Sequence, residues 1–264
     1  MTEQSCEPEG MIELIEMLLA ERADKRTVTV PGNPLDRWNL LRALMNTREP
    51  APAPDDMLAL QDNVLARIHA LRETTHVSNL SHVPLDERMA LWQGDITTLA
   101  ADAIVNAANS KLLGCFVPGH RCIDNAIHTF AGMQLRLACN DIMSVRVRDE
   151  PVGTATVTSA FNLPAAHVIH TVGPFVFDAP TMSHVSELAS CYASCLEAAA
   201  ERGFASIAFC CISTGEFRFP HEQAAEIAVR SVKDFLATDT TLETVVFNVF
   251  TDEDRRIYER LLMV

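Results

Sequence analysis

Two cysteines and a histidine lie close together within residues 106–128, NAANSKLLGCFVPGHRCIDNAIH. Cys115, His120 and Cys122 have the spacing C-x4-H-x-C. Thiolate sulfur and imidazole nitrogen are ligands that Zn²⁺ prefers in proteins, and this spacing allows all three side chains to reach one ion. Catalytic zinc sites keep one position open for water or substrate, so the segment is a candidate catalytic Zn²⁺ site.

The local spacing leaves two other interpretations open. In the first, a fourth side chain from elsewhere in the fold closes a structural zinc site, the candidates being His128, Cys139, Cys210 and Cys211. In the second, the cysteines bind no metal and only pack as small apolar side chains.

Asp124 and His128 follow the three ligands on the first turns of a predicted helix, spaced to share a face. Asp124 is a candidate to orient His120 or to act as a general base. An acid at this position also suits a helix start without any catalytic role. We expect His128 to be packed rather than to bind metal.

Composition restricts the class of protein. The 264 residues include 35 acidic and 21 basic side chains, a formal charge of −14, which argues against binding to a nucleic-acid backbone. The eight cysteines lack the spacing of a secreted disulfide framework. The N-terminal sequence has no signal peptide and no stretch of membrane-spanning character. We therefore expect a cytoplasmic protein that does not bind membranes.

Residues 1–80 are predicted to form a small helical extension. Apolar residues recur at helical spacing in residues 8–26 and 35–46, and again after Asp55, which can cap a third helix. The proline-rich residues 50–54 separate the last two helices. The extension has no catalytic signature, so we expect it to pack on the rest of the chain or to dock a partner.

Residues 81–264 are predicted to form a second domain in which strands and helices alternate. This order favours a mixed sheet covered by helices on both faces, with a ligand crevice at the carboxyl ends of the strands. The expected strands are residues 88–93, 103–106, 153–160, 168–172, 206–212 and 244–250, and the expected helices are residues 124–143, 183–202, 220–236 and 252–263.

Polar loops follow three of these strands. Asp95, in Gly94-Asp95-Ile96-Thr97, can accept a hydrogen bond from an adenine amino group or can cap the next turn. Asn109 can bond ribose hydroxyls or its own backbone. Both side chains therefore have a binding role and a structural role open to them.

The loop of residues 212–220, ISTGEFRFP, leaves an apolar strand and enters a helix in which Pro220 suits the first position. Its small residues allow backbone N–H groups to approach a diphosphate, and Phe217 and Phe219 can pack on a ribose or a base. The alternative is a simple strand-to-helix turn capped by Ser213 or Thr214.

Taken together, GDIT at 94–97, NAAN at 106–109 and ISTG at 212–215 resemble the ADP-ribose-binding signature of the macrodomain family. The resemblance covers residues 80–264 and implies a three-layer α/β/α sandwich with ADP-ribose in its crevice. It implies that Asp95 and Ile96 hold the adenine and that Asn109 faces the distal ribose. The diphosphate and that ribose would lie against Ser213, Thr214, Gly215, Glu216 and Phe217. Phe250, near the end of the last strand, is a further candidate for the adenine.

The segment around Cys115, His120 and Cys122 is similar to the zinc-containing macrodomains of microbes, which resemble protein ADP-ribosyl hydrolases acting on acidic side chains. The similarity implies a catalytic Zn²⁺ and a mono-ADP-ribosylated protein as substrate. We expect Asn109 and Asp124 to act in catalysis beside the three ligands. It also implies that the N-terminal helices belong to this subfamily. The alternative function is a module that binds ADP-ribose without cleaving it, with zinc shaping the pocket.

Overall fold

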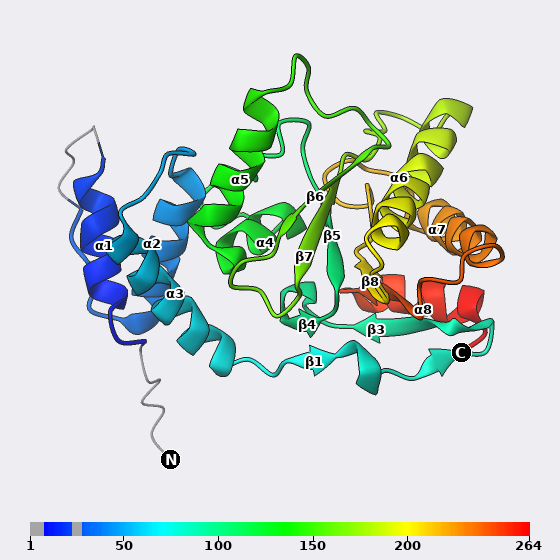
Figure 1. The fold of residues 1–264 in the computed structure, drawn as a ribbon, viewed down its shortest axis with the longest axis horizontal. Coiled ribbons are helices and arrows are strands. Elements are labelled where there is room, and N and C mark those ends of the chain that lie inside the picture. Colours follow the sequence, from blue (N-terminus) through cyan, green and yellow to red (C-terminus); the bar gives the residue numbers. More distant parts are fainter. Residues whose placement is uncertain (1–7, 23–27) are drawn as a thin grey trace.

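The computed structural model describes residues 8–22 and 28–264. Its main feature is a seven-stranded mixed sheet with the order β2-β3-β9-β8-β5-β7-β6 (Figure 1). The inner strands run parallel to one another, whereas β2 and β6 at the edges are antiparallel to their neighbours. The strands are β2 (His82–Val83), β3 (Asp86–Gln93), β5 (Ala103–Ala107), β6 (Ala155–Ser159), β7 (His167–Thr171), β8 (Ser206–Phe209) and β9 (Thr244–Val249).

The parallel register brings the carboxyl ends of the strands to one edge of the sheet. Gln93, the last residue of β3, pairs with Val249 of β9, and Ala107 of β5 pairs with Thr171 of β7. Strands β5, β7, β8 and β9 are largely buried and rich in valine, isoleucine and alanine, as expected for strands covered on both faces, whereas β3 is mostly half-buried. The loops that carry Asp95, Asn109 and Ser213 therefore all start from this edge.

Helices cover both faces of the sheet, and Figure 1 shows α4 and α5 on one side of the strands and α6, α7 and α8 on the other. The helices are α4 (Ile123–Ala131), α5 (Met133–Ser144), α6 (Met182–Glu201), α7 (His221–Leu236) and α8 (Asp252–Leu262). The three-layer α/β/α sandwich predicted from the sequence is confirmed.

Three predicted element boundaries were wrong. Residues 124–143 do not form one helix, because Gly132 has a φ of 95° that ends α4 and begins α5. Pro220 is the N-cap of α7 rather than its first residue. The predicted strand at 206–212 also stops at Phe209, and residues 210–212 already belong to the loop that follows.

The N-terminal helices α1 (Met11–Ala20), α2 (Pro34–Thr47) and α3 (Asp55–Ala70) pack around a hydrophobic cluster of their own. Met133 of α5 is part of this cluster, so the three helices pack against the domain that contains the sheet. Figure 1 shows them beside α4 and α5. Residues 23–26 of the first predicted helix lie outside the described residues.

Short elements connect the helical extension to the sheet. β1 (Thr75–His76) pairs with β4 (Leu99–Ala100), and two 3-10 turns, η1 (Val77–Asn79) and η2 (Ile96–Thr98), lie next to them. Val77 and Val83 already pack in the core of the sheet domain. The helices thus end at Ala70, and the chain from Thr75 onward packs with the sheet.

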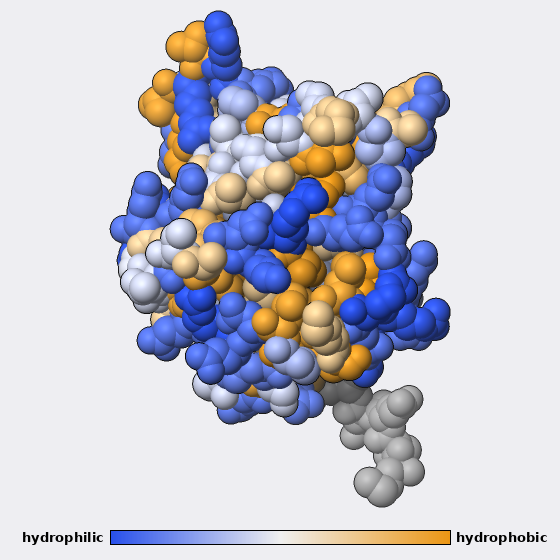
Figure 2. Space-filling view, turned by 90° about the vertical axis from the view of Figure 1, so that its right-hand side faces the viewer, coloured by the Kyte–Doolittle hydropathy of each residue, from blue (hydrophilic) through white to orange (hydrophobic). Residues whose placement is uncertain are grey.

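The surface is mixed in character. Seen from the side of α7, hydrophilic residues surround hydrophobic ones that gather near the middle of the face (Figure 2). Among the described helices, none combines the length and the apolar character needed to cross a bilayer.

Candidate metal centre and ligand crevice

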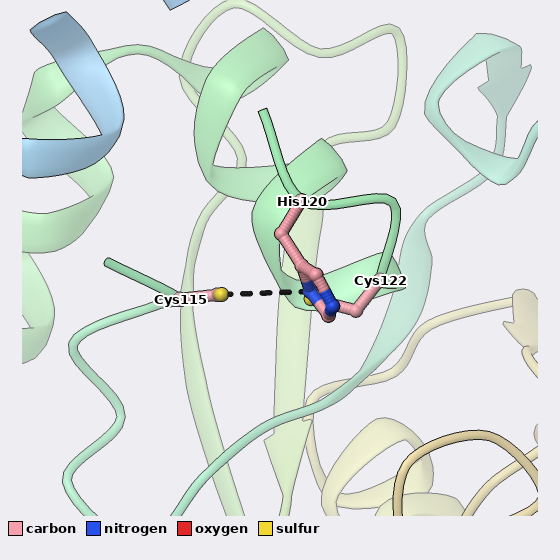
Figure 3. Close-up of side chains that lie close together, drawn as sticks. All are labelled: Cys115, His120 and Cys122. Carbon is pink, nitrogen blue, oxygen red and sulfur yellow. Dashed lines mark hydrogen bonds between the residues drawn. The ribbon is translucent and has the colours of Figure 1, made fainter. Parts of the chain in front are cut away.

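The structure brings the three predicted metal ligands together. The sulfur atoms of Cys115 and Cys122 and a ring nitrogen of His120 all lie within 4.8 Å of one another (Figure 3). Cys115 Sγ is 3.7 Å from His120 Nδ1. Two ligands of a tetrahedral Zn²⁺, at Zn–S and Zn–N bonds of about 2.3 and 2.0 Å, are separated by roughly 3.6 Å, so this donor set fits the ion.

The proposed fourth ligands do not join this group. Among the histidine, cysteine and carboxylate side chains that the structure describes, only the three predicted ligands meet at this point. His128 and Cys139 instead form a separate buried group with His170. The geometry therefore matches a site with an open position rather than a site closed by four side chains.

Cys122 is also the N-cap of α4, where its Sγ accepts a hydrogen bond from the backbone N–H of Asn125 over 3.4 Å. Burial raises the pKa of this thiol to about 12, and the N–H of Asn125 acts in the opposite direction. A helix N-terminus stabilises a thiolate, and a bound cation displaces the thiol proton. The position of Cys122 thus suits a thiolate ligand once a metal ion supplies positive charge.

Glu216, and not Asp124, is the acidic partner of His120. Nε2 of His120 lies 3.5 Å from Oε1 of Glu216, while Nδ1 faces Cys115. Metal-bound histidines commonly use the second ring nitrogen to contact a carboxylate, which fixes the orientation of the ring. The expectation that Asp124 orients His120 was wrong, because both ring nitrogens of His120 face other groups.

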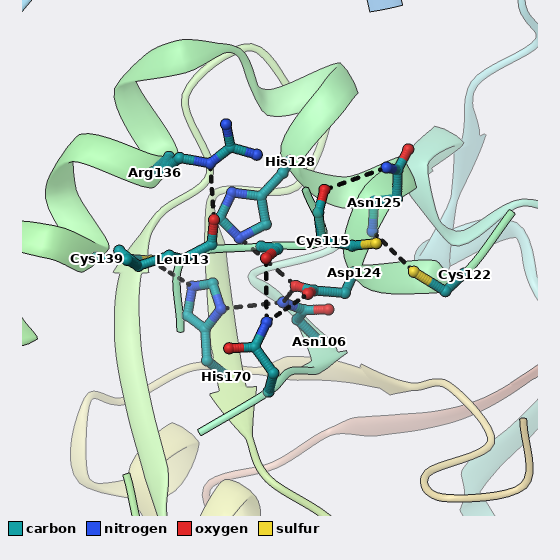
Figure 4. Close-up of polar contacts among 12 residues, drawn as sticks. Asn106, Leu113, Cys115, Cys122, Asp124, Asn125, His128, Arg136, Cys139 and His170 are labelled. Carbon is teal, nitrogen blue, oxygen red and sulfur yellow. Dashed lines mark hydrogen bonds and ion pairs between the residues drawn. The ribbon is translucent and has the colours of Figure 1, made fainter. Parts of the chain in front are cut away.

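Asp124 instead orients the two asparagines of the NAAN motif. It is buried and accepts hydrogen bonds from Asn106 Nδ2 at 2.8 Å and from Asn109 Nδ2 at 3.3 Å (Figure 4). Asn109 Nδ2 also donates to the carbonyl of Gly114, and its Oδ1 accepts from the N–H of Lys111. Burial raises the pKa of Asp124 to about 6. The carboxyl group thus fixes the side chain of Asn109 near the start of the metal loop, the segment of residues 108–122 that carries Cys115, His120 and Cys122.

A second buried polar group lies behind Asn106. His170 Nδ1 is 3.1 Å from Asn106 Nδ2, and its Nε2 is 2.9 Å from the hydroxyl of Thr158. His128 is buried, as predicted, and lies 3.6 Å from Asp124. Burial lowers the pKa of His128 well below 6.5 and that of His170 to about 3, so both rings are neutral.

The loop after β8 has the shape of an anion cradle. Ser213 and Arg218 adopt left-handed backbone conformations, with φ of 66° and 58°. Within the described residues, the backbone N–H groups of Gly215, Glu216 and Phe217 have no acceptor. The buried hydroxyl of Ser213 is also without a partner there. Such unpaired donors suit the oxygens of a diphosphate.

Other side chains of this loop contact the protein. Thr214 donates its hydroxyl to the carbonyl of Cys211, and Phe217 contacts Phe175 edge to face. Phe219, considered from the sequence as a ribose or base contact, is wrong in that role because it is 1% exposed and belongs to the core.

Asp95 has the capping role considered for it. Its Oδ1 caps η2 by accepting from the N–H of Thr97, and its Oδ2 accepts from Arg72 at 2.6 Å. Ile96 is buried beneath the same turn. Both carboxylate oxygens of Asp95 thus accept hydrogen bonds within the protein. The side chain is half-exposed, and its remaining lone pairs could accept a hydrogen bond from a base.

Phe250, the further candidate for the adenine, lies directly after β9 with 74% of its surface exposed. Asn248, in β9, donates its side-chain amide to the carbonyls of Trp92 and Gly94. It therefore supports the loop that carries Asp95.

Three polar residues around the metal loop were missed by the sequence reasoning. Asn125 Nδ2 donates to the carbonyls of Cys115 and Val117. Arg42 and Asn46, both from α2, contact the loop as well. Asn125 has a detectable signal, its place on the first turn after Cys122, whereas nothing in the sequence links α2 with residues far away in the chain.

The comparisons with known proteins agree with this fold. Residues 105–228 match the family model described as Macro domain. The chain is 47% identical over 258 residues to a protein-ADP-ribose hydrolase of Treponema medium, which covers 96% of this chain and 98% of that protein. It is 46% identical over 247 residues to a protein-ADP-ribose hydrolase of Staphylococcus aureus strain MRSA252, covering 93% and 92%.

Solved structures with nucleotide ligands are similar in fold. The Trypanosoma brucei macrodomain in complex with ADP-ribose aligns with a TM-score of 0.65 and 29% identity, covering 83% of this chain and 94% of that one. The Oceanobacillus iheyensis macrodomain with ADP aligns with a TM-score of 0.61 and 35% identity, covering 66% of this chain and 90% of that one.

Proposed function

The chain belongs to the macrodomain family, and we propose that it is a hydrolase that removes single ADP-ribose groups from the acidic side chains of modified proteins, with a Zn²⁺ ion held by Cys115, His120 and Cys122. The names of the two hydrolase relatives, which align over almost the whole chain, support the hydrolytic activity. Thiolate ligands need a reducing environment, so the proposal places the reaction in the cytoplasm.

The observation that carries the proposal is the position of the three ligands beside the crevice. Their donor atoms converge within 4.8 Å, and Glu216, which lies 3.5 Å from His120, is part of the loop expected to bind the diphosphate. A metal at this point would thus lie between the anion cradle and Asn109. That is where the distal ribose of a bound ADP-ribose is expected.

Each part of the crevice has a task in this proposal. Asp95 and the backbone N–H of Ile96 bind the adenine, and the free N–H groups of residues 215–217 neutralise the diphosphate and orient it. Asn109, held by Asp124, bonds a hydroxyl of the distal ribose. Zn²⁺, when bound, supplies a Lewis acid that can polarise a ribose oxygen or lower the pKa of a water molecule.

The reaction breaks the bond between the anomeric carbon and the acceptor oxygen. Water adds its oxygen to the carbon, and the acceptor leaves as a free carboxylate while ADP-ribose is released. A carboxylate is an adequate leaving group, so the chain needs mainly to orient the sugar and to exclude competing reactions. Asn109 and the 215–217 loop perform this orientation on either side of the metal loop.

The test is release of ADP-ribose from a protein modified on aspartate or glutamate. Cys115→Ser and Cys122→Ser should lower kcat/KM at least about 100-fold, because removal of a zinc ligand disrupts the ion that the chemistry uses. Cys211→Ser is the matched control, since the thiol of Cys211 lies outside the metal group and donates to the carbonyl of Asn248. Thermal unfolding and ADP-ribose binding verify that each variant is folded.

Two results would overturn the proposal. A folded Cys115→Ser variant with wild-type turnover would exclude catalysis by zinc at this site. If the wild type binds zinc and ADP-ribose but releases nothing from aspartate-, glutamate-, serine- or arginine-linked substrates, the protein is a binding module instead.

A further inference from the structure

The loop that carries the metal ligands has almost no regular structure of its own. Residues 108–122 contain neither a helix nor a strand, and of the three ligands only Cys122 borders a regular element, as the N-cap of α4. Arg136 of α5 donates to the carbonyl of Leu113 and lies over the ring of Phe116. Phe116 and Val117, at the tip of the loop, are exposed. A metal centre needs its ligands held in place before the ion arrives, so other parts of the chain must fix this loop.

Arg42 of α2 makes the first of these contacts. Its Nη2 donates to the backbone carbonyl of His120 at 2.8 Å and to Oδ1 of Asn125 at 2.7 Å. One guanidinium nitrogen thus joins a metal ligand to the first turn of α4. Both bonds are partly buried, where a charged donor is strong and its loss leaves two acceptors without a partner.

Asn46 makes the second contact from the same face of α2, since it lies four residues after Arg42. Its Oδ1 accepts from the N–H of Gly119 at 3.1 Å, and its Nδ2 donates to the hydroxyl of Thr129 at 2.9 Å. Asn46 is 1% exposed. Gly119 precedes His120 and has a left-handed φ of 64°, so this bond fixes a turn that places the histidine.

Asn125 extends the contact of Arg42 to both cysteines. Its side-chain Nδ2 donates to the carbonyls of Cys115 at 3.3 Å and Val117 at 3.1 Å, and its backbone N–H donates to the sulfur of Cys122 at 3.4 Å (Figure 4). Because Arg42 holds Oδ1 of this amide, it determines which way the Nδ2 group points. All three ligands are therefore linked to α2 through one or two hydrogen bonds.

We infer that the helical extension is a working part of the metal centre, with Arg42 and Asn46 of α2 acting as positioning residues that hold the metal loop in its binding conformation. The inference rests on the proposed zinc site. It differs from a purely structural role of the extension, in which loss of these contacts lowers stability but leaves the folded protein with the same affinity for zinc.

The experiment measures zinc affinity of the full-length, metal-free protein by competition with a chromophoric chelator. Arg42→Met and Asn46→Ala should each weaken zinc binding by about 10- to 100-fold, the loss typical when groups that orient metal ligands are removed. Arg42→Lys keeps one charged donor and should recover part of the affinity. Arg67→Met is the control, because Arg67 is an exposed arginine of α3 that pairs, among the described residues, only with Glu9.

A second readout reports geometry rather than activity. Co²⁺ bound in place of zinc to two thiolates and one imidazole has a visible absorption spectrum that depends on the arrangement of its ligands. In Arg42→Met and Asn46→Ala this spectrum should lose intensity or shift, whereas Arg67→Met should match the wild type. Thermal unfolding of the metal-free variants separates this effect from a general loss of stability.

The outcomes are distinguishable. If the wild type and the Arg67→Met control bind zinc and the folded Arg42→Met and Asn46→Ala variants bind it equally well, the inference is wrong while the proposed function stands. If the wild type itself binds no zinc, the metal-dependent part of the proposed function fails and the inference fails with it. If Arg42→Met does not fold, Arg42→Lys and Asn46→Ala decide the result.

Discussion

At the scale of single residues, Glu216 connects the metal group with the diphosphate loop. Its carboxylate lies 3.5 Å from Nε2 of His120, although 74% of the side chain is exposed. Carboxylate partners of metal-bound histidines raise the basicity of the ring and fix its orientation, and solvent weakens the effect. We expect Glu216→Ala to lower zinc affinity by about tenfold and Glu216→Gln to lower it less.

Chelator competition on the metal-free protein measures this change. Glu226→Ala is the control, because Glu226 is an exposed glutamate of α7 and is not part of the metal group. Zinc affinity of Glu216→Ala equal to that of the wild type would mean that the carboxylate serves only the nucleotide.

Arg72 is the corresponding residue at the end of the crevice where we expect the adenine. It donates to Oδ2 of Asp95 at 2.6 Å and to the hydroxyl of Thr97 at 2.8 Å, and its guanidinium lies 4.0 Å from the ring centre of Phe130. These contacts hold the carboxylate in one orientation. Arg72→Met should weaken ADP-ribose binding about fivefold, from a loss of ~1 kcal/mol in this half-exposed pair.

Isothermal titration calorimetry with ADP-ribose tests this expectation, again with Arg67→Met as the control. Tighter binding in Arg72→Met would contradict it, because that result would show that Arg72 competes with the base for Asp95.

At the scale of elements, the break between α4 and α5 depends on Gly132. Its φ is 95°, and a Cβ atom at this position would lie 2.5 Å from Nε2 of Gln61 and 2.8 Å from Oε1 of Gln134. Gln61 comes from α3 and accepts from the N–H of Met133, so the break also joins the extension to α5. Gly132→Ala should lower the free energy of unfolding by about 1–3 kcal/mol.

Urea denaturation measures this loss as a lower midpoint with an unchanged slope. Gly32→Ala is the matched control, since an added Cβ there would meet nothing within 4 Å. It should change stability by less than about 0.5 kcal/mol. Equal midpoints for the two variants would show that Gly132 tolerates a side chain.

The same elements show what the sequence could predict. Cys115, His120 and Cys122 are local in the chain, and the three loops are marked by short motifs, so both were identified before the structure. The break at Gly132 was not, because one glycine within a helical pattern is tolerated at a cost of about 1 kcal/mol and gives only a weak signal.

Contacts between distant segments were also beyond the sequence. Glu216 and His120, or Arg42 and Asn125, meet only because the sheet and the helical extension bring them together. Side-chain hydrogen bonds of this kind leave no periodic pattern, so the partner of His120 was assigned to the nearest acid in the chain, Asp124. The spacing in the sequence predicts which side chains meet at the proposed metal site, whereas only the structure shows which residues hold them.

At the scale of the whole molecule, the buried polar group between the sheet and the helices α4 and α5 couples stability to pH. His128 and His170 remain neutral in the folded protein because burial lowers their pKa, that of His170 to about 3. In the unfolded chain, each of these two rings takes up a proton as the pH falls below 6.5. Stability from both rings is therefore present above pH 6.5 and is lost as the pH decreases.

Asp124 acts in the opposite direction. Burial raises its pKa from 3.8 to about 6, so between these values the folded protein binds this proton more readily than the unfolded chain does. Its contribution increases as the pH falls through this window. At acidic pH the two histidines favour proton uptake by the unfolded chain, and the one carboxyl group favours uptake by the folded protein. The unfolded chain therefore binds about one proton more, so stability should fall by ~1.4 kcal/mol per pH unit.

We therefore expect the free energy of unfolding of the metal-free protein to decrease as the pH falls from 6.5 to 4. His170→Gln should make the dependence of this free energy on pH less steep by about one proton, or ~1.4 kcal/mol per pH unit. Urea denaturation at several pH values gives the slope, and comparing slopes removes the constant cost of losing the bond to Thr158. His184→Gln is the control, because His184 is a partly exposed histidine at the start of α6, where its ring accepts from the N–H of Thr181. If His170→Gln and the wild type have the same slope, the His170 ring does not stay neutral in the folded protein. The ring that contacts Asn106 would then take up a proton at mildly acidic pH.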